Sequence, residues 1–286
     1  MTTQLSPTKA VPDPIAWGWE LRPGFAGEQP SPYHRFRWRI PLRGERAPFL
    51  PLARGRHTAC YVNAFEPGRG EVNFHAHDDE ATWLVLAGEA TFWSTDAAEG
   101  MQVRQHQGLL IPLGAAYRYE NTGDGLLVML RGAARPDVLP VSAGFPVGAR
   151  PGGVELTWRK DLWRRPAAAA PEPFVRFDVR YPLRSENFLP WQVLVKGDHI
   201  GLHVSCLEPE RGEVNLHSHD DEAIWVVLHG EVAFYGWEDD RLIGVLRSDD
   251  GIVIPKDAHY RYQNTGDGYL VMLRYGGRAE AVPVAG

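Results

Sequence analysis

Short apolar runs, each ended by turn-forming residues, fill most of the chain beyond residue 34. Clear examples span residues 60–65, 81–86, 89–93, 108–111 and 125–130. Gly, Pro, Asn and Asp separate these runs, as in Asn121-Thr-Gly-Asp-Gly125, and such clusters favour turns. No strong amphipathic helix pattern interrupts them. Many short strands at even spacing predict an all-β sandwich or closed barrel.

Nearly the same order of residues occurs twice. Glu71-Val-Asn-Phe-His75-Ala-His77 returns as Glu213-Val-Asn-Leu-His217-Ser-His219, 142 residues later. Flanking segments repeat at offsets between 141 and 143 residues, so the unit is about 105 residues long, a common domain size. We therefore expect four segments: an N-terminal arm at 1–33, a first domain at 34–140, a linker at 141–174 and a second domain at 175–284.

Composition narrows the classes of partner. The chain has 286 residues, a formal net charge of −6 and no block of basic residues, which disfavours nucleic acid and anionic membranes as partners. No apolar run reaches the ~20 residues of a membrane helix, and the first residues lack the pattern of a signal peptide. Cys60 and Cys206 occupy non-equivalent repeat positions, and we interpret them as buried thiols of a cytoplasmic protein. The expected partner is a small molecule.

Each repeat contains a His-x-His pair, His75 with His77 and His217 with His219. Alternate residues of a strand point to the same face, so each pair can direct two imidazoles into one cavity. Imidazole is the commonest protein ligand for a transition metal. The pairs therefore predict metal binding.

These motifs, taken together and in order, resemble the cupin superfamily, and the duplication resembles a bicupin. The resemblance covers roughly residues 34–140 and 175–284. It implies two tandem double-stranded β-helix (jelly-roll) barrels. It also implies a metal held by the two His, by a Glu shortly after them, and by a His four residues before the Asn of the second motif. Because bicupins resemble a fused dimer, the two repeats should pack pseudo-symmetrically, and a further homodimer is an open expectation.

The ligand set departs from that pattern. Ala81 and Ala223 stand where the family carries Glu, and the nearest acids, Glu80 and Glu222, come one residue early. A one-residue shift sends a strand side chain to the opposite face, unless a bulge reverses it.

The expected His of the second motif is also replaced. Tyr117 and Tyr260 occupy that position, and His259 is again one residue off. Three site models remain open. Each barrel could use two His and the nearby Glu, close to the arrangement that suits non-heme Fe(II). Two His and a Tyr phenol could bind the metal. Alternatively, the second barrel alone is complete, with His217, His219, Glu222 and His259.

Trp83 and Trp225 share strand parity with Ala81 and Ala223, so they should face the interior as core or as a substrate wall. Tyr117 and Tyr260 are expected to line the pocket or to handle protons. The leading hypothesis is a metal-dependent enzyme acting on a small organic substrate, such as an aromatic or polyketide-like molecule, and specifically a non-heme iron dioxygenase. The alternatives are a non-redox isomerase, lyase, decarboxylase or cyclase using Zn, Mn or Ni, and a non-catalytic binding protein.

Overall fold

The computed structural model describes residues 33–38, 49–95, 99–135, 174–179, 191–209, 213–236 and 240–278. Residues 1–32 of the expected arm and 141–173 of the expected linker lie outside this part. The described residues form strands and turns, with no α-helix among them. None of their segments is a helix of the length and apolarity needed to cross a membrane.

The first repeat contributes ten strands. Their bounds are β1 His34–Arg37, β2 Phe49–Arg54, β3 Thr58–Phe65, β4 Gly70–His75, β5 Glu80–Ala87, β6 Glu89–Ser94, β7 Met101–Arg104, β8 Gln107–Ile111, β9 Tyr117–Asn121 and β10 Leu127–Ala134.

The second repeat contributes ten equivalent strands. Their bounds are β11 Val175–Asp178, β12 Trp191–Lys196, β13 Ile200–Leu207, β14 Glu213–His217, β15 Glu222–His229, β16 Glu231–Gly236, β17 Leu242–Arg247, β18 Asp250–Ile254, β19 Tyr260–Asn264 and β20 Leu270–Gly277.

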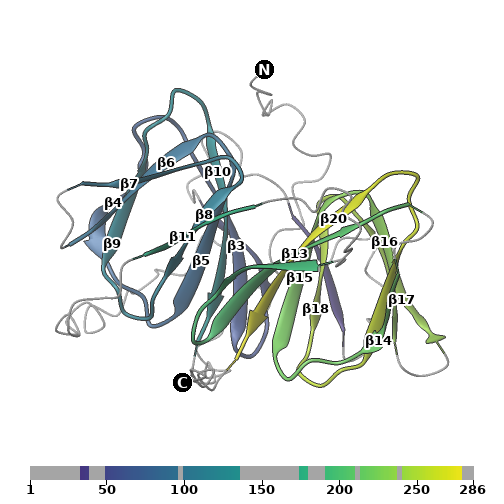
Figure 1. The fold of residues 1–286 in the computed structure, drawn as a ribbon. Helices are drawn as coiled ribbons and strands as arrows, with labels where there is room; N and C mark the ends of the chain where they lie inside the picture. The colour runs from purple at the N-terminus through teal and green to yellow at the C-terminus, as the bar shows by residue number, and fades with distance from the viewer. Residues whose placement is uncertain are drawn as a thin grey trace, which may run out of the picture.

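Each barrel consists of a six-stranded sheet and a four-stranded sheet. The first barrel has the orders β11-β8-β5-β10-β3-β2 and β4-β9-β6-β7, and the second has β1-β18-β15-β20-β13-β12 and β14-β19-β16-β17. Figure 1 shows the two barrels side by side, blue for the first and green to yellow for the second. The prediction of two tandem β barrels is confirmed.

The strands that open the repeats cross over between the barrels. β1 pairs antiparallel with β18 of the second repeat, and β11 pairs antiparallel with β8 of the first. In Figure 1 the green β11 accordingly lies beside β8 in the blue barrel. A side chain at Gly251 would collide with Phe36, and one at Gly108 would collide with Phe177. Each exchanged strand therefore packs a phenyl ring directly over a glycine of its partner.

Three apolar clusters form the core. One fills each barrel, around Trp83 and Tyr117 in the first and around Trp225 and Tyr260 in the second. The third joins side chains of both repeats, among them Leu84 and Leu273. Because strand side chains alternate, the six-stranded sheets face a barrel interior on one side and the other barrel on the opposite side.

Candidate metal centre

The first barrel brings three potential metal ligands together. His75 ends β4, His77 follows two residues later, and Glu71 lies near the start of the same strand. One donor atom of each lies within 4.8 Å of the others. His75 Nε2 is 2.9 Å from Glu71 Oε2. His75 Nδ1 is 2.9 Å from the carbonyl oxygen of Asn73. A hydrogen bond from Nδ1–H leaves Nε2 as the coordinating atom, which is how proteins commonly orient a histidine ligand.

The second barrel repeats the histidine geometry but not the third donor. His217 Nδ1 is 2.6 Å from the carbonyl oxygen of Asn215, and the rings of His217 and His219 lie 4.9 Å apart. Glu213, the counterpart of Glu71, instead accepts a hydrogen bond of 3.2 Å from Arg261 and is 46% exposed. Across the described segments, no second group of three close donors is found. The fuller set thus lies in the first barrel, whereas one sequence model placed it in the second.

The environment keeps these imidazoles in the form that binds metals. Burial, followed by the positive charge of Arg131, holds the pKa of His77 well below its ordinary value. Burial, followed by Arg274, lowers the pKa of His219 to about 4. Burial also lowers the pKa of His217. Neutral imidazole is required for coordination, so no proton has to be displaced from them near pH 7.

Glu80 and Glu222 lie at the interface between the barrels. Glu80 accepts hydrogen bonds from the backbone N–H groups of 198–200, at 3.2, 2.6 and 2.9 Å. Glu222 accepts the equivalent bonds from residues 56–58, at 2.7, 3.0 and 3.0 Å. No bulge reverses their parity, so both carboxylates point out of the barrels. The structure does not bring them to the histidines; the carboxylate that lies beside His75 and His77 is that of Glu71.

The other predicted residues divide into interior and surface positions. Tyr117 and Tyr260 are buried, and their rings lie 4.5 Å from those of His75 and His217 respectively. Trp83 and Trp225 are buried in the same interiors, as their parity predicts. His259 is exposed, and its backbone carbonyl accepts a hydrogen bond from Tyr33. Among the residues that the structure describes, its ring belongs to no group of three close donors.

A buried ion pair inside each barrel escaped the sequence analysis. Arg131 donates to Asp79 at 2.5 Å, and Arg274 donates to Asp221 through both terminal nitrogens. Arg131 and Arg274 share strand parity with the interior residues Met129 and Met272. The sequence did contain a signal for this pair. In the repeated segment Leu-Val-Met-Leu-Arg, the Arg lies two residues after the interior Met, so both side chains face the barrel interior.

A family model described as "Cupin domain" matches residues 62–131 and 203–274, one match in each barrel. The chain is a two-domain cupin. No curated protein matches its sequence at a significant level.

Solved structures with the same fold have diverse descriptions. AerE from Microcystis aeruginosa has a TM-score of 0.58 at 11% identity, over 85% of this bicupin and 98% of that chain. A Bacillus subtilis oxalate decarboxylase OxdC variant has a TM-score of 0.58 at 15% identity, over 82% of this chain and 74% of the other. The coconut allergen cocosin has a TM-score of 0.60 at 12% identity, over 87% and 86%. At these identities the likeness establishes the fold alone.

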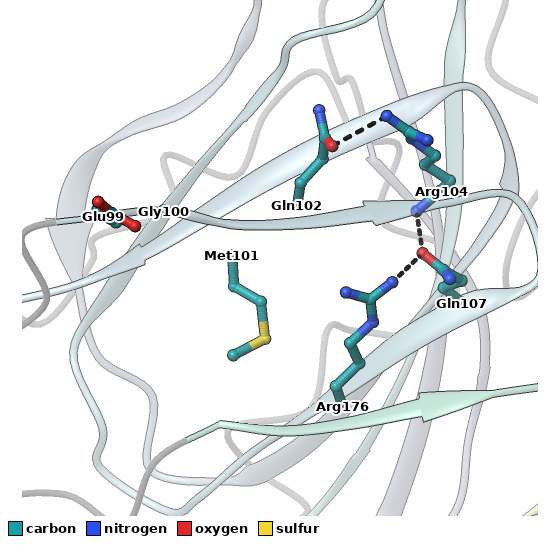
Figure 2. A pocket seen from close by; sticks show the side chains of 7 residues that line it. All are labelled: Glu99, Gly100, Met101, Gln102, Arg104, Gln107 and Arg176. Atoms are coloured by element: carbon teal, nitrogen blue, oxygen red, sulfur yellow. Dashed lines mark hydrogen bonds between the residues drawn. The ribbon is translucent and has the colours of Figure 1, made fainter.

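A hollow on the outside of the bicupin lies apart from the histidines. It has a volume of about 450 Å³ and is lined by Glu99, Gly100, Met101, Gln102, Arg104, Gln107 and Arg176. Figure 2 shows Gln107 accepting hydrogen bonds from Arg104 and Arg176, at 3.1 and 2.7 Å. The hollow is exposed, and these side chains largely bind one another, so it does not compete with the barrel interior as the candidate site.

Proposed function

We propose that this bicupin is a metal-dependent enzyme whose metal is held in the first barrel by Glu71, His75 and His77. The observation that carries the proposal is the close approach of these three donors, combined with the backbone bond that orients His75. Two histidines and one carboxylate leave coordination positions free for a substrate. This donor set suits non-heme Fe(II), and Zn, Mn or Ni are the alternatives.

A bound metal would supply O₂ chemistry in the case of Fe(II), or Lewis-acid activation of a substrate oxygen otherwise. The surrounding residues set the conditions. Burial raises the pKa of Tyr117, so its hydroxyl stays protonated near neutral pH and serves as a hydrogen-bond donor or general acid. Trp83 forms an apolar wall that excludes water. The non-heme iron dioxygenase remains our preferred reaction class, with a small organic molecule as substrate.

The second barrel then serves mainly as a structural partner for the catalytic one. Its histidines are oriented in the same way, but Glu213 is drawn to Arg261. We place the enzyme in the cytoplasm because its two cysteines, Cys60 and Cys206, are both unpaired and such thiols fit a reducing compartment. A further homodimer is an open proposal that light scattering tests.

The test is a count of metal per chain in the full-length protein, for wild type, Glu71→Gln, His75→Ala and His217→Ala. Glu213→Gln is the matched control, since it changes the equivalent residue of the second barrel. We expect one equivalent in wild type and in the control. His75→Ala should abolish binding, and Glu71→Gln should weaken it at least tenfold. Loss of metal only in His217→Ala would transfer the site to the second barrel, and no metal after reconstitution would refute the proposal.

The identity of the metal decides between the reaction classes. The dioxygenase would be supported if the protein loaded with iron consumed O₂ while it converted a substrate. A preference for Zn, Mn or Ni with turnover under argon would replace it by the non-redox alternative.

A further inference from the structure

The four-stranded sheet of the first barrel presents large apolar side chains on its outer face. The sheet has the order β4-β9-β6-β7, and in Figure 1 it forms the side of the blue barrel that is turned away from the second barrel. Val72 and Phe74 lie on β4, at the edge of this sheet, and are 50% and 43% exposed. Exposed apolar side chains that lie side by side mark candidate interaction surfaces.

The neighbouring strand β9 adds one positive and one negative charge to the same face. Tyr119 is buried in the barrel interior, so Arg118 and Glu120 on either side of it point outward, about 7 Å apart along the strand. Within the described part of the chain, neither side chain takes part in a salt bridge or hydrogen bond. Arg118 only stacks on the ring of Trp93, at 3.9 Å, and lies 5.6 Å from that of Phe74. Both charges are therefore available to a partner.

The equivalent face of the second barrel is neutralised from within. Its arginine, Arg261, donates two hydrogen bonds of 2.5 Å to Asp240 and one of 3.2 Å to Glu213. The uncharged Gln263 stands where the first barrel has its glutamate. In the first barrel the counterpart of Glu213 points inward, to His75. Free charges of both signs on the outer face thus distinguish the first barrel from the second.

Two opposite charges on one strand are complementary to themselves under a two-fold axis. When two copies pack face to face with their β9 strands antiparallel, Arg118 of each copy lies opposite Glu120 of the other. Two ion pairs then form at once, as an isologous interface requires. The same packing removes Val72 and Phe74 from water.

We propose that this bicupin forms a two-fold homodimer through the outer face of the sheet β4-β9-β6-β7. Arg118 and Glu120 pair across the axis, and Val72, Phe74 and Trp93 form the apolar part of the contact. A face of four short strands belongs to the small end of specific interfaces, so we expect a weak, reversible dimer. The contact lies on the opposite side of β4 from the candidate metal ligands and does not depend on a bound metal.

The experiment is sedimentation velocity of the full-length protein, from low micromolar to submillimolar concentrations. We expect wild type to become dimeric as the concentration rises. Arg118→Glu and Glu120→Arg each place like charges opposite one another, and each should weaken the dimer about tenfold or more. An equal mixture of these two variants should form a heterodimer, since one copy then carries two acids and the other two arginines. Gln263→Arg, the equivalent change in the second barrel, is the matched control and should leave the dimer unchanged.

The mixing experiment separates a lost contact from a damaged fold, because two misfolded variants would not associate specifically. A monomer at every concentration would overturn the proposal. A dimer that both variants leave intact would place the contact on another face, and a mixture that associates no better than either variant alone would show that the two charges do not pair. Removing metal with a chelator should leave the dimer unchanged, so this outcome is independent of the metal count.

Discussion

At the residue scale, the two barrels carry different residues opposite their buried arginines. Tyr61 lies opposite Arg131 in the first barrel, whereas His203 lies opposite Arg274 in the second. Burial, followed by the charge of Arg274, lowers the pKa of His203 to about 4. The folded protein therefore keeps this imidazole neutral at a pH where the unfolded chain binds a proton.

This difference predicts a pH-dependent stability. The contribution of His203 to the free energy of unfolding is fully present above pH 6.5, the ordinary pKa of histidine. It is lost as the pH falls from 6.5 toward 4, because in this range the imidazole takes up a proton only in the unfolded chain. The contribution of His203 between pH 7.5 and pH 5 is about 2 kcal/mol. His203→Tyr introduces the residue that the first barrel has at this position. Urea unfolding at pH 7.5 and at pH 5 should therefore show a smaller decrease in the free energy of unfolding for this variant than for wild type. An unchanged pH dependence would contradict the assignment.

The candidate histidine ligands were predicted from the sequence, whereas Glu71 was overlooked. Glu71, His75 and His77 share parity, which was a usable signal. However, the pairing of β4 with β9 shifts register between Glu71 and His75, and sequence does not reveal whether such a bulge preserves the face. The same pattern in the second repeat leaves Glu213 with Arg261, so the choice depends on neighbouring charges.

At the element scale, Glu80 and Glu222 connect the barrels by binding the turns before β13 and β3. A side chain at Gly197 would collide with the Glu80 carboxylate, and one at Gly55 would collide with that of Glu222. Each carboxylate therefore packs against a glycine of the other repeat.

The strands predicted at 60–65, 81–86 and 108–111 from their apolar pattern are confirmed. The backbone N–H groups that bind the two carboxylates could not be predicted from the sequence, because they lie about 120 or more residues away along the chain.

Removing one of these carboxylates should weaken the interface. Glu80→Ala leaves three backbone N–H groups without an acceptor, and at least one of them is buried, so we expect a loss of about 2–4 kcal/mol in the free energy of unfolding. Glu89→Ala is the control, because Glu89 makes an exposed pair with Arg104 and should cost less than about 1 kcal/mol. Urea denaturation measures both. If Glu80→Ala instead removed metal and left stability unchanged, Glu80 would be a ligand after all.

At the scale of the whole molecule, the repeat in the sequence does not coincide with the barrels in space. The predicted domain boundaries at residues 34 and 175 assign β1 to the first domain and β11 to the second, yet β1 joins a sheet of the second barrel and β11 joins a sheet of the first. Local pattern cannot reveal this exchange, because β1 and β11 have only four residues each and would pair equally well with either of two similar sheets. The exchange makes each barrel depend on the other repeat for its edge.

That dependence predicts a crossed response to mutation. Phe36 and Phe177 are buried, at 9% and 6% exposure, and pack over Gly251 and Gly108 of the opposite repeats. Truncating either to Ala should cost about 3–5 kcal/mol. Amide hydrogen exchange locates the effect: Phe36→Ala should raise exchange in β18, and Phe177→Ala should raise it in β8. Each variant is the control for the other. If each mutation loosened only its own repeat, the exchanged strands would not stabilise the barrels that they join.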